Sequence, residues 1–469
     1  MKQPLIAPIV EAVRSGKTTA VAQVTEAIAR AEKAKDFNAI ISMTTDRALE
    51  RARMIDERVA RGETTGRLLG VPFIAKDNFL TFGGETTAAS TMLKGFMAPY
   101  QSTAIERLEA EGAICIGKAN LDAFAHGGST ENSDFGPTLN PHDKSRVPGG
   151  SSGGSAASVA LSIVPFALGT DTGGSIRLPA SYCGVVGFKP TYGRVSRFGV
   201  VAMASSTDTI GPLATTVADA ALVLECMAGL DARDSTSLPK PLETVAITNA
   251  PKALRIGVIK ECMGEGIDPM TRQVVEAKIA DFKAAGHSVE TVSIPSTELA
   301  LAVYYVVVPA EISSNLARFD GIRFGYSAKD AESLQETYEK SRSAGFNTEN
   351  KRRIMIGNYV LSSGYYDAYY KRAQTVRTII MKEYTAAFAK YDVLLSPVAP
   401  TAAFALGAKA DPLAMYMVDV MTVGPSLAGL PAISVPLEVG KELPVGLQII
   451  GAAGHDALVL QVAAHAEAA

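Results

Sequence analysis

Two loops rich in glycine and serine carry the side chains best suited to covalent chemistry. The first spans 149–157 and reads GGSSGGSAA, and the second spans 169–177 and reads GTDTGGSIR. Glycine allows the backbone to approach a bound group closely. In the second loop, successive N–H groups from Thr172 to Ser175, through Gly173 and Gly174, could converge on one oxygen, as an oxyanion hole requires. The loop is therefore compatible with a nucleophilic Ser175, although taken alone it is equally compatible with a tight turn that carries a solvated serine.

A nucleophilic serine needs a base, and the sequence offers two kinds. One kind is histidine, at positions 126, 142, 287, 455 and 465; a Ser-His-Asp triad is recognised by geometry, so it stays possible. The other is Lys76, which lies within the apolar segment GVPFIAKDNF (70–79). Burial would lower its pKa toward neutrality and make it a usable base. On a strand, Asp77 would point to the opposite face. The alternative is an edge lysine whose amine lies in water.

Phosphate binding is the competing interpretation of the glycine-rich segments. Residues 15–18, SGKT, look like the end of a phosphate-binding loop, but Glu11 stands where the full motif needs glycine. We therefore predict a turn between two helices there. The first Gly/Ser loop leads into a predicted helix at 155–163, and a helix N-terminus can hold an anion. No lysine follows its glycines, and it has no G-x-G-x-x-G pattern.

The surrounding elements predict an α/β fold that could position these loops. Helices are expected at 24–33, 46–62, 102–112, 217–229 and 268–286, with Ser102 capping the third and Gly112 ending it. Strands are expected at 70–79, 113–117, 163–168, 254–260, 287–295, 391–400, 432–438 and 446–451, and a surface connection at 231–252. The last three strands are apolar enough to need neighbours on both faces, so we expect one continuous fold.

The composition narrows the class of protein. The chain has 469 residues, 47% of them hydrophobic, which is enough for a large core and argues against disorder. Its net charge of −3 argues against tight binding of nucleic acid by this chain alone. The four cysteines are too widely spaced for a CxxC metal or redox motif. The start lacks a long apolar region, and no run approaches the length of a membrane span. We expect a cytoplasmic enzyme, in bacterial cytosol rather than an organelle.

Three motifs together resemble the amidase signature family. They are VPFIAKDN, PGGSSGGSAA and GTDTGGSIRLPA, within a match from about 65 to 215. The resemblance implies a single domain over 1–469, with a helical segment over about 1–65 and a mixed, largely parallel sheet sandwiched between helices. It implies that Lys76, Ser151 in a cis peptide and the nucleophile Ser175 form the catalytic set, with Ser152 in support. It requires no metal.

Further segments resemble the A subunits of glutamyl/aspartyl-tRNA amidotransferases. They include ENSDFGPTLNPHD (131–143), PAEISSNLARFDGIRFGY (309–326), KRRIMIGNYVLSSGYYDAYYKRAQ (351–374) and LPVGLQIIG (443–451), so the similarity covers nearly the whole chain. The resemblance implies glutamine or asparagine as substrate, held by Tyr305, Arg353 and Asp419. Tyr304 and Arg352 are adjacent alternatives, because the register could differ by one. A carboxylate suits the substrate amino group, and a guanidinium can take its carboxylate bidentately.

The same resemblance implies partners and a carbon–nitrogen ligase reaction with glutamine as amido donor. A B subunit would use ATP and Mg²⁺ and bind the misacylated tRNA, a C subunit would help assembly, and this chain would need no cofactor of its own. The sequence departs from the family pattern at Ala123, His126, Leu178 and Thr209, which bears on the pocket shape and the ammonia exit. A free-standing amidase, a nucleotide-binding protein and a silent scaffold remain the alternatives.

Overall fold

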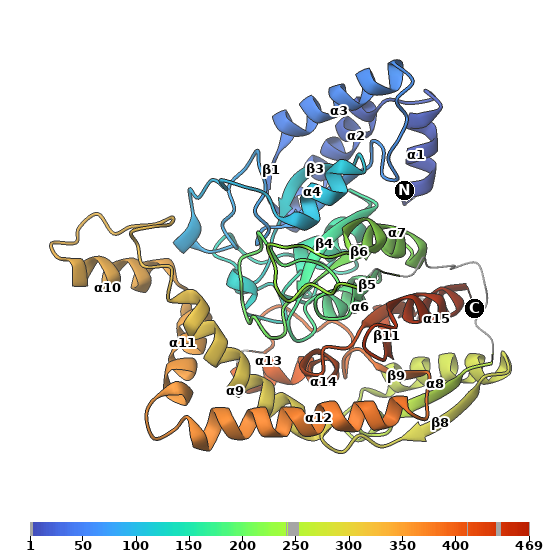
Figure 1. Cartoon of the computed structure of the whole chain (residues 1–469), viewed down its shortest axis with the longest axis vertical. Coiled ribbons are helices and arrows are strands. Elements are labelled where there is room, and N and C mark those ends of the chain that lie inside the picture. Colours follow the sequence, from blue (N-terminus) through green and yellow to red (C-terminus); the bar gives the residue numbers. More distant parts are fainter. Residues whose placement is uncertain (1–2, 241, 243–252, 410, 438–441, 469) are drawn as a thin grey trace.

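One mixed sheet of eleven strands runs through the computed structural model, which describes residues 3–240, 242, 253–409, 411–437 and 442–468 (Figure 1). The strand order is β1-β3-β2-β4-β6-β5-β10-β11-β9-β7-β8. The strands are β1 (Ile40–Met43), β2 (Pro72–Lys76), β3 (Ile114–Ala119), β4 (Phe166–Asp171), β5 (Val186–Lys189), β6 (Thr209–Ala214), β7 (Arg255–Ile259), β8 (Ser288–Val292), β9 (Val393–Pro397), β10 (Ala432–Leu437) and β11 (Val445–Gly451). Early and late segments thus share one sheet, and the expected α/β class is confirmed.

Helices pack around this sheet, with α1 to α3 at the top of the view, α12 at the bottom, and α10 projecting at the left (Figure 1). The α-helices are α1 (Ile6–Arg14), α2 (Ala20–Lys33), α3 (Thr45–Ala60), α4 (Thr103–Ala110), α5 (Gly153–Ala160), α6 (Arg177–Cys183), α7 (Val217–Met227), α8 (Pro269–Ala284), α9 (Thr297–Leu316), α10 (Leu334–Gly345), α11 (Thr348–Leu361), α12 (Arg372–Phe388), α13 (Pro412–Tyr416), α14 (Val423–Leu427) and α15 (Asp456–Ala468). Short helical turns are η1 (Lys35–Phe37), η2 (Thr91–Leu93), η3 (Ala123–Ala125), η4 (Glu261–Met263), η5 (Asp367–Lys371) and η6 (Met417–Asp419).

The sheet is mixed, as expected, but the expectation that it is largely parallel was wrong. Parallel pairing joins β2 to β3, β2 to β4, β7 to β8 and β7 to β9. The other six pairings among the described strands are antiparallel. Strands β5 and β6 follow one another without an intervening helix and pair antiparallel, whereas the parallel neighbours β2 and β3, and β7 and β8, are joined through α4 and α8.

Most expected elements occur close to their expected bounds. Ser102 caps α4, because its Oγ accepts a hydrogen bond from the N–H of Ile105 at 3.4 Å, and Gly112 follows with a φ of +91°. The segment SGKT forms the predicted turn between α1 and α2. Of the expected surface connection at 231–252, residues 241 and 243–252 lie outside the described residues.

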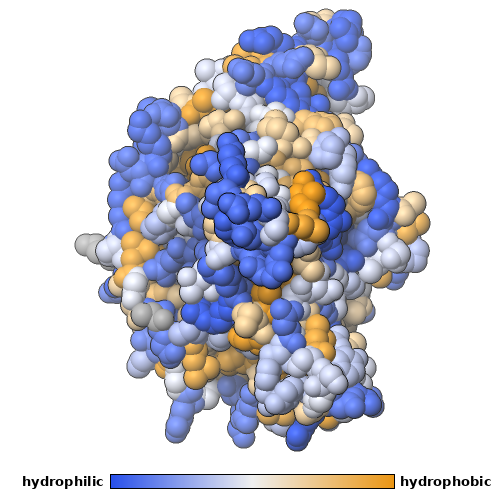
Figure 2. All heavy atoms as spheres, turned by 90° about the vertical axis from the view of Figure 1, so that its left-hand side faces the viewer, coloured by the Kyte–Doolittle hydropathy of each residue, from blue (hydrophilic) through white to orange (hydrophobic). Residues whose placement is uncertain are grey.

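One described helix, α9, is long and apolar enough to cross a membrane by length and composition. Its most apolar window is 56% buried inside the protein, and its buried residues join the hydrophobic core that includes Ile354 of α11 and Ile380 of α12. Helix α9 therefore belongs to the core. The face that carries α10 intersperses hydrophilic and hydrophobic side chains (Figure 2).

The fold brings the lysine and the second Gly/Ser loop together. Strands β2 and β4 are parallel neighbours, with Phe73 beside Phe166 and Ala75 beside Leu168. Strand β2 ends at Lys76 and β4 ends at Asp171. Because parallel strands place their carboxyl ends at one edge, Lys76 and the loop after Asp171 meet there.

Candidate active site

Lys76 is completely buried and bonded to three hydroxyl groups. Its Nζ lies 2.8 Å from Ser151 Oγ, 2.9 Å from Ser152 Oγ and 2.9 Å from Thr170 Oγ1. The alternative of an edge lysine with its amine in water is therefore excluded. The two serines come from the first Gly/Ser loop and Thr170 from β4, so both loops converge on this amine.

The surroundings of Lys76 favour its neutral form. No carboxylate of the described residues lies within ion-pair distance of its amine, because Asp77 pairs instead with Lys118 at 2.9 Å. Burial lowers the pKa of Lys76 to about 7, although the more distant charges of Asp122 and Asp171 oppose this shift. A neutral amine at ordinary pH can accept a proton, which a general base requires.

The first Gly/Ser loop is fixed by Asp122. The peptide bond between Gly150 and Ser151 is cis, as the resemblance implies. Asp122 accepts hydrogen bonds from the N–H groups of Thr130 and Asn132, and its own N–H donates to the Ser151 carbonyl at 3.3 Å. A Cβ at Gly150 would lie 2.2 Å from the Asp122 carboxylate, so only glycine fits there.

The second loop is held by a buried ion pair. Asp171 Oδ1 lies 2.9 Å from Arg177 Nη2, and Asp171 Oδ2 accepts from Arg177 Nε at 3.0 Å and from the Ile176 N–H at 3.1 Å. Arg177 also donates to Gln448 and Ser426. This pair closes the loop over residues 172–175 and ties it to the late strands.

Ser175 lies at the mouth of this arrangement, with 8% of its surface exposed. The N–H of Ser152 donates to the Ser175 carbonyl at 3.1 Å, which joins the two loops. Among the hydrogen bonds of the described residues, none joins the Ser151 and Ser175 hydroxyls directly. None uses the N–H groups of Thr172, Gly173, Gly174 or Ser175 either, so these four donors stay available to a ligand.

Of the two candidate tyrosines, Tyr304 lies against the second loop. A Cβ at Gly173 would lie 2.7 Å from the Tyr304 hydroxyl and 2.6 Å from its ring, so the loop needs glycine at that point. Tyr305 instead stacks on Tyr416, with ring centroids 3.9 Å apart. The geometry thus favours Tyr304, the adjacent alternative, as the tyrosine that contacts the loop carrying Ser175.

Of the two candidate arginines, Arg353 faces inward. It is 3% exposed, its guanidinium lies 5.3 Å from the Tyr305 ring centroid, and its Nε donates to Glu349 at 2.8 Å. Arg352 pairs with the other oxygen of Glu349 and its side chain is 38% exposed. Of the two positions that the sequence allowed, Arg353 is therefore the one that provides a buried cation near the site.

Asp419 completes the set beside the second loop. Its Oδ1 would lie 3.3 Å from a Cβ at Gly174. Burial raises the pKa of Asp419 to about 8, and the positive charge of Arg353 limits the rise. The carboxyl can therefore hold a proton near neutral pH and give it up when a cation binds.

Histidine plays no part in this arrangement. None of the histidines in the described ranges hydrogen-bonds to Ser175. His126 is buried; its Nδ1 lies 2.8 Å from Asn350 Nδ2, and its Nε2 has no partner among the described residues. Burial, and secondly the charge of Arg353, hold the pKa of His126 well below its usual value.

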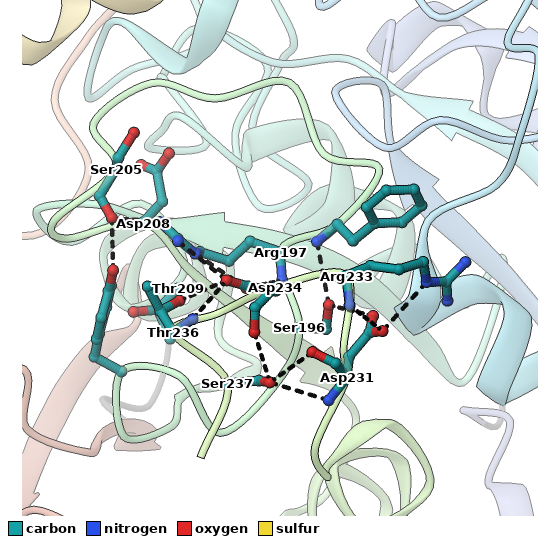
Figure 3. A network of polar contacts seen from close by, with 12 residues as sticks. Ser196, Arg197, Ser205, Asp208, Thr209, Asp231, Arg233, Asp234, Thr236 and Ser237 are labelled. Atoms are coloured by element: carbon teal, nitrogen blue, oxygen red, sulfur yellow. Dashed lines mark hydrogen bonds and ion pairs between the residues drawn. The ribbon is translucent and has the colours of Figure 1, made fainter. Parts of the chain in front are cut away.

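The other departures from the family pattern lie around the site. Ala123 is buried in η3, and Leu178 packs in a small cluster with Val418. Thr209 lines a cavity of about 220 Å³ that Thr170, Asp208 and Arg197 also line. Figure 3 shows the polar network at this cavity, where Asp234 accepts from Arg197 and Asp231 from Arg233. Asp208 also accepts from the Thr172 hydroxyl at 2.7 Å, so the cavity adjoins the second loop.

The chain belongs to the amidase family, whose model, described as Amidase, matches residues 22–460. It is 52% identical over 431 residues to the A subunit of glutamyl-tRNA(Gln) amidotransferase from Thermosynechococcus vestitus, in a match that covers 91% of this chain and 89% of the relative. The crystal structure of the A subunit of glutamyl-tRNA(Gln) amidotransferase from Thermotoga maritima superposes with a TM-score of 0.80 at 37% identity, over 98% and 93% of the two chains. A bacterial aryl acylamidase superposes with a TM-score of 0.87 at 27% identity, over 99% and 96%.

Several residues that shape the site were not singled out from sequence. Thr170, Asp171 and Arg177 lie inside the motif GTDTGGSIR, so their position beside Ser175 was available as a signal. Asp122 binds the N–H groups of Thr130 and Asn132, eight and ten residues further along the chain, and Glu349 pairs with Arg353 one helical turn away. The spacing of Glu349 and Arg353 on one helix was therefore available as a local signal. No local pattern marks the bond between Glu349 and Tyr416, because those residues are 67 positions apart in the sequence.

Proposed function

We propose that this chain is the glutamine-hydrolysing subunit of a tRNA-dependent amidotransferase. The contact of the buried Lys76 amine with the Ser151 hydroxyl at 2.8 Å carries the catalytic part of the proposal. The amidotransferase relatives, at about half identity over most of the chain, support the biological part. The reaction supplies ammonia that converts Glu-tRNA(Gln), or Asp-tRNA(Asn), into the amidated form.

The proposed mechanism runs through the three side chains in order. Neutral Lys76 takes a proton from Ser151, and Ser151 takes one from Ser175 as Ser175 Oγ attacks the amide carbon. The N–H groups of Thr172, Gly173, Gly174 and Ser175, which lack acceptors among the described residues, hold the oxyanion. The relay then protonates the leaving ammonia. Water hydrolyses the acyl-enzyme by the reverse transfers.

Substrate recognition is assigned to the charges around the second loop. Arg353 takes the substrate carboxylate, because a guanidinium can bind it through two parallel hydrogen bonds. Asp419, beside Gly174, takes the ammonium group, and Tyr304 packs against Gly173 of the same loop, with Tyr305 in a supporting stack. Ser152, bonded to Lys76, supports the amine.

The partners follow from the same proposal. Ammonia passes to a B subunit that activates the tRNA-linked acid with ATP and Mg²⁺ and binds most of the tRNA, and a small C subunit helps assembly. The complex works in the cytoplasm, and residues 1–469 form one amidase domain, which the single sheet supports.

The test is glutamine-dependent amidation of misacylated tRNA by the chain co-purified with its partner subunits. Ser175→Ala should abolish amidation with glutamine and retain it with ammonium chloride, because the partner's site remains intact. Loss with both nitrogen sources would show that the substitution damages the complex as a whole. Retention with both would remove Ser175 from the mechanism and favour the scaffold alternative.

A free-standing amidase is the second candidate, and the overlay with the aryl acylamidase favours it at the level of fold. Hydrolysis of small neutral amides by the isolated chain, faster than its hydrolysis of glutamine and unchanged by the partners, would favour this alternative.

A further inference from the structure

Glu349, on α11, is bonded to groups from two separate segments. Its Oε1 accepts from Arg353 Nε at 2.8 Å and from the Tyr416 hydroxyl at 3.1 Å. Its Oε2 pairs with Arg352. Glu349 is 8% exposed, so these bonds are made away from bulk water, where charge-assisted hydrogen bonds are strong.

Two aromatic rings complete the surroundings of Arg353. Tyr305 and Tyr416 stack with an interplanar angle of 20°, and the Arg353 guanidinium lies 5.3 Å and 5.4 Å from their centroids. A cation this close to an aromatic ring is attracted by its electrons. The Nε–H is taken by Glu349, whereas the two NH₂ groups of Arg353 have no hydrogen-bond partner among the described residues.

Tyr416 connects these surroundings to the carboxylate of the site. It ends α13, and Asp419 ends the next turn, η6, three residues later. Asp419 lies beside Gly174, while Arg353 belongs to α11. The Glu349–Tyr416 bond is therefore a direct tie between the segment that carries the anion and the helix that carries the cation.

We propose that Glu349 is a positioning residue that couples Arg353 to Asp419, so that the site selects amides carrying both a carboxylate and an ammonium group. This inference rests on the proposed function. With the Nε–H held, the two NH₂ groups of Arg353 point as a fork toward a carboxylate. With Tyr416 held, Asp419 keeps a fixed place relative to that fork. A neutral amide or acylating reagent makes no use of this arrangement.

The experiment measures glutamine binding through protection of the reactive serine, a readout separate from the turnover rate. The purified full-length chain is treated with phenylmethanesulfonyl fluoride, a neutral reagent for reactive serines, and L-glutamine is added as a protecting ligand. The variants are Glu349→Ala, Glu349→Gln and Tyr416→Phe. Arg352→Met is the matched control, because it removes only the exposed partner of the same carboxylate.

Glu349→Ala should need about tenfold to a hundredfold more glutamine for half protection, as expected for losing charge-assisted hydrogen bonds. Its reaction rate without glutamine should equal that of the wild type. Glu349→Gln keeps an acceptor oxygen and should recover part of the loss, Tyr416→Phe should lose less than Glu349→Ala, and Arg352→Met should match the wild type.

Protection of Glu349→Ala at the wild-type glutamine concentration would overturn the proposal. So would a loss of serine reactivity as large as the loss of protection, since that would show general damage to the fold. If glutamine fails to protect the wild type, whose serine still reacts, the proposed function itself fails, and the coupling fails with it.

Discussion

The carboxylate of Asp77 lies 2.9 Å from the amine of Lys118 and does not pair with its sequence neighbour Lys76. Lys76 ends β2 and Asp77 follows it directly; the Lys76 amine contacts the hydroxyls of Ser151, Ser152 and Thr170, whereas Asp77 forms an ion pair. Lys118 supplies the positive charge that Asp77 needs. Lys76 is thereby left among hydroxyl groups, with a pKa that burial lowers to about 7.

This pKa gives a pH profile for the serine nucleophile. The rate at which phenylmethanesulfonyl fluoride modifies Ser175 should rise about tenfold per pH unit below about pH 7 and level off about one unit above it, because only neutral Lys76 acts as a base. Lys76→Met should lower the plateau by at least about a thousandfold. A wild-type rate that is flat between about pH 5.5 and about pH 9 would contradict the assignment.

Asp419 predicts a separate pH dependence of substrate binding. Burial raises its pKa to about 8, so the carboxyl is mostly protonated below that pH, when it binds an ammonium group poorly. Half-protection by glutamine should therefore need less ligand as the pH rises from about 6.5 to about 8.5. In Asp419→Asn, protection should be weaker and nearly independent of pH over this range. Equal pH dependence in both proteins would assign the effect to another group.

The two adjacent tyrosines should respond differently to loss of the hydroxyl. Tyr304→Phe removes a hydroxyl that lies at Gly173, so kcat/KM for glutamine should fall about tenfold. Tyr305→Phe keeps the ring that stacks on Tyr416, so kcat/KM should change by less than about threefold. Steady-state glutaminase kinetics of both variants provide the check. The reverse order would restore Tyr305 as the substrate-facing residue.

The buried His126 predicts an acid-dependent loss of stability. Its pKa in the folded chain is held well below 6.5, so below that pH the unfolded chain binds a proton that the folded chain does not. The resulting loss is up to about 1.4 kcal/mol per pH unit. His126→Leu lacks this term, so between about pH 7 and about pH 5 the free energy of unfolding of the wild type should fall relative to the variant by about 2 kcal/mol. Urea unfolding at both pH values tests this, and a constant difference between the proteins would argue against it.

The sequence predicted the α/β class and most element positions, because apolar strands and capped helices leave local patterns such as Ser102 and Gly112. It also predicted that Lys76 and the two loops belong together. It failed on the balance of parallel and antiparallel pairs, because pairing depends on which distant segments become neighbours. Which of Tyr304 and Tyr305 faces the second loop could not be predicted, since a shift of one helical residue changes the exposed face by about 100°. The bond between Glu349 and Tyr416 could not be predicted either, because it joins residues 67 positions apart in the sequence.

The site draws its parts from two distant stretches of the chain. The amine, the hydroxyls and the free N–H groups come from residues 76–175, whereas Tyr304, Arg353 and Asp419 come from helices and turns beyond residue 300. Bond cleavage and recognition can thus diverge separately in evolution. A descendant with substitutions only beyond residue 300 can accept different amides as substrates. The residues proposed to cleave the amide bond would remain unchanged.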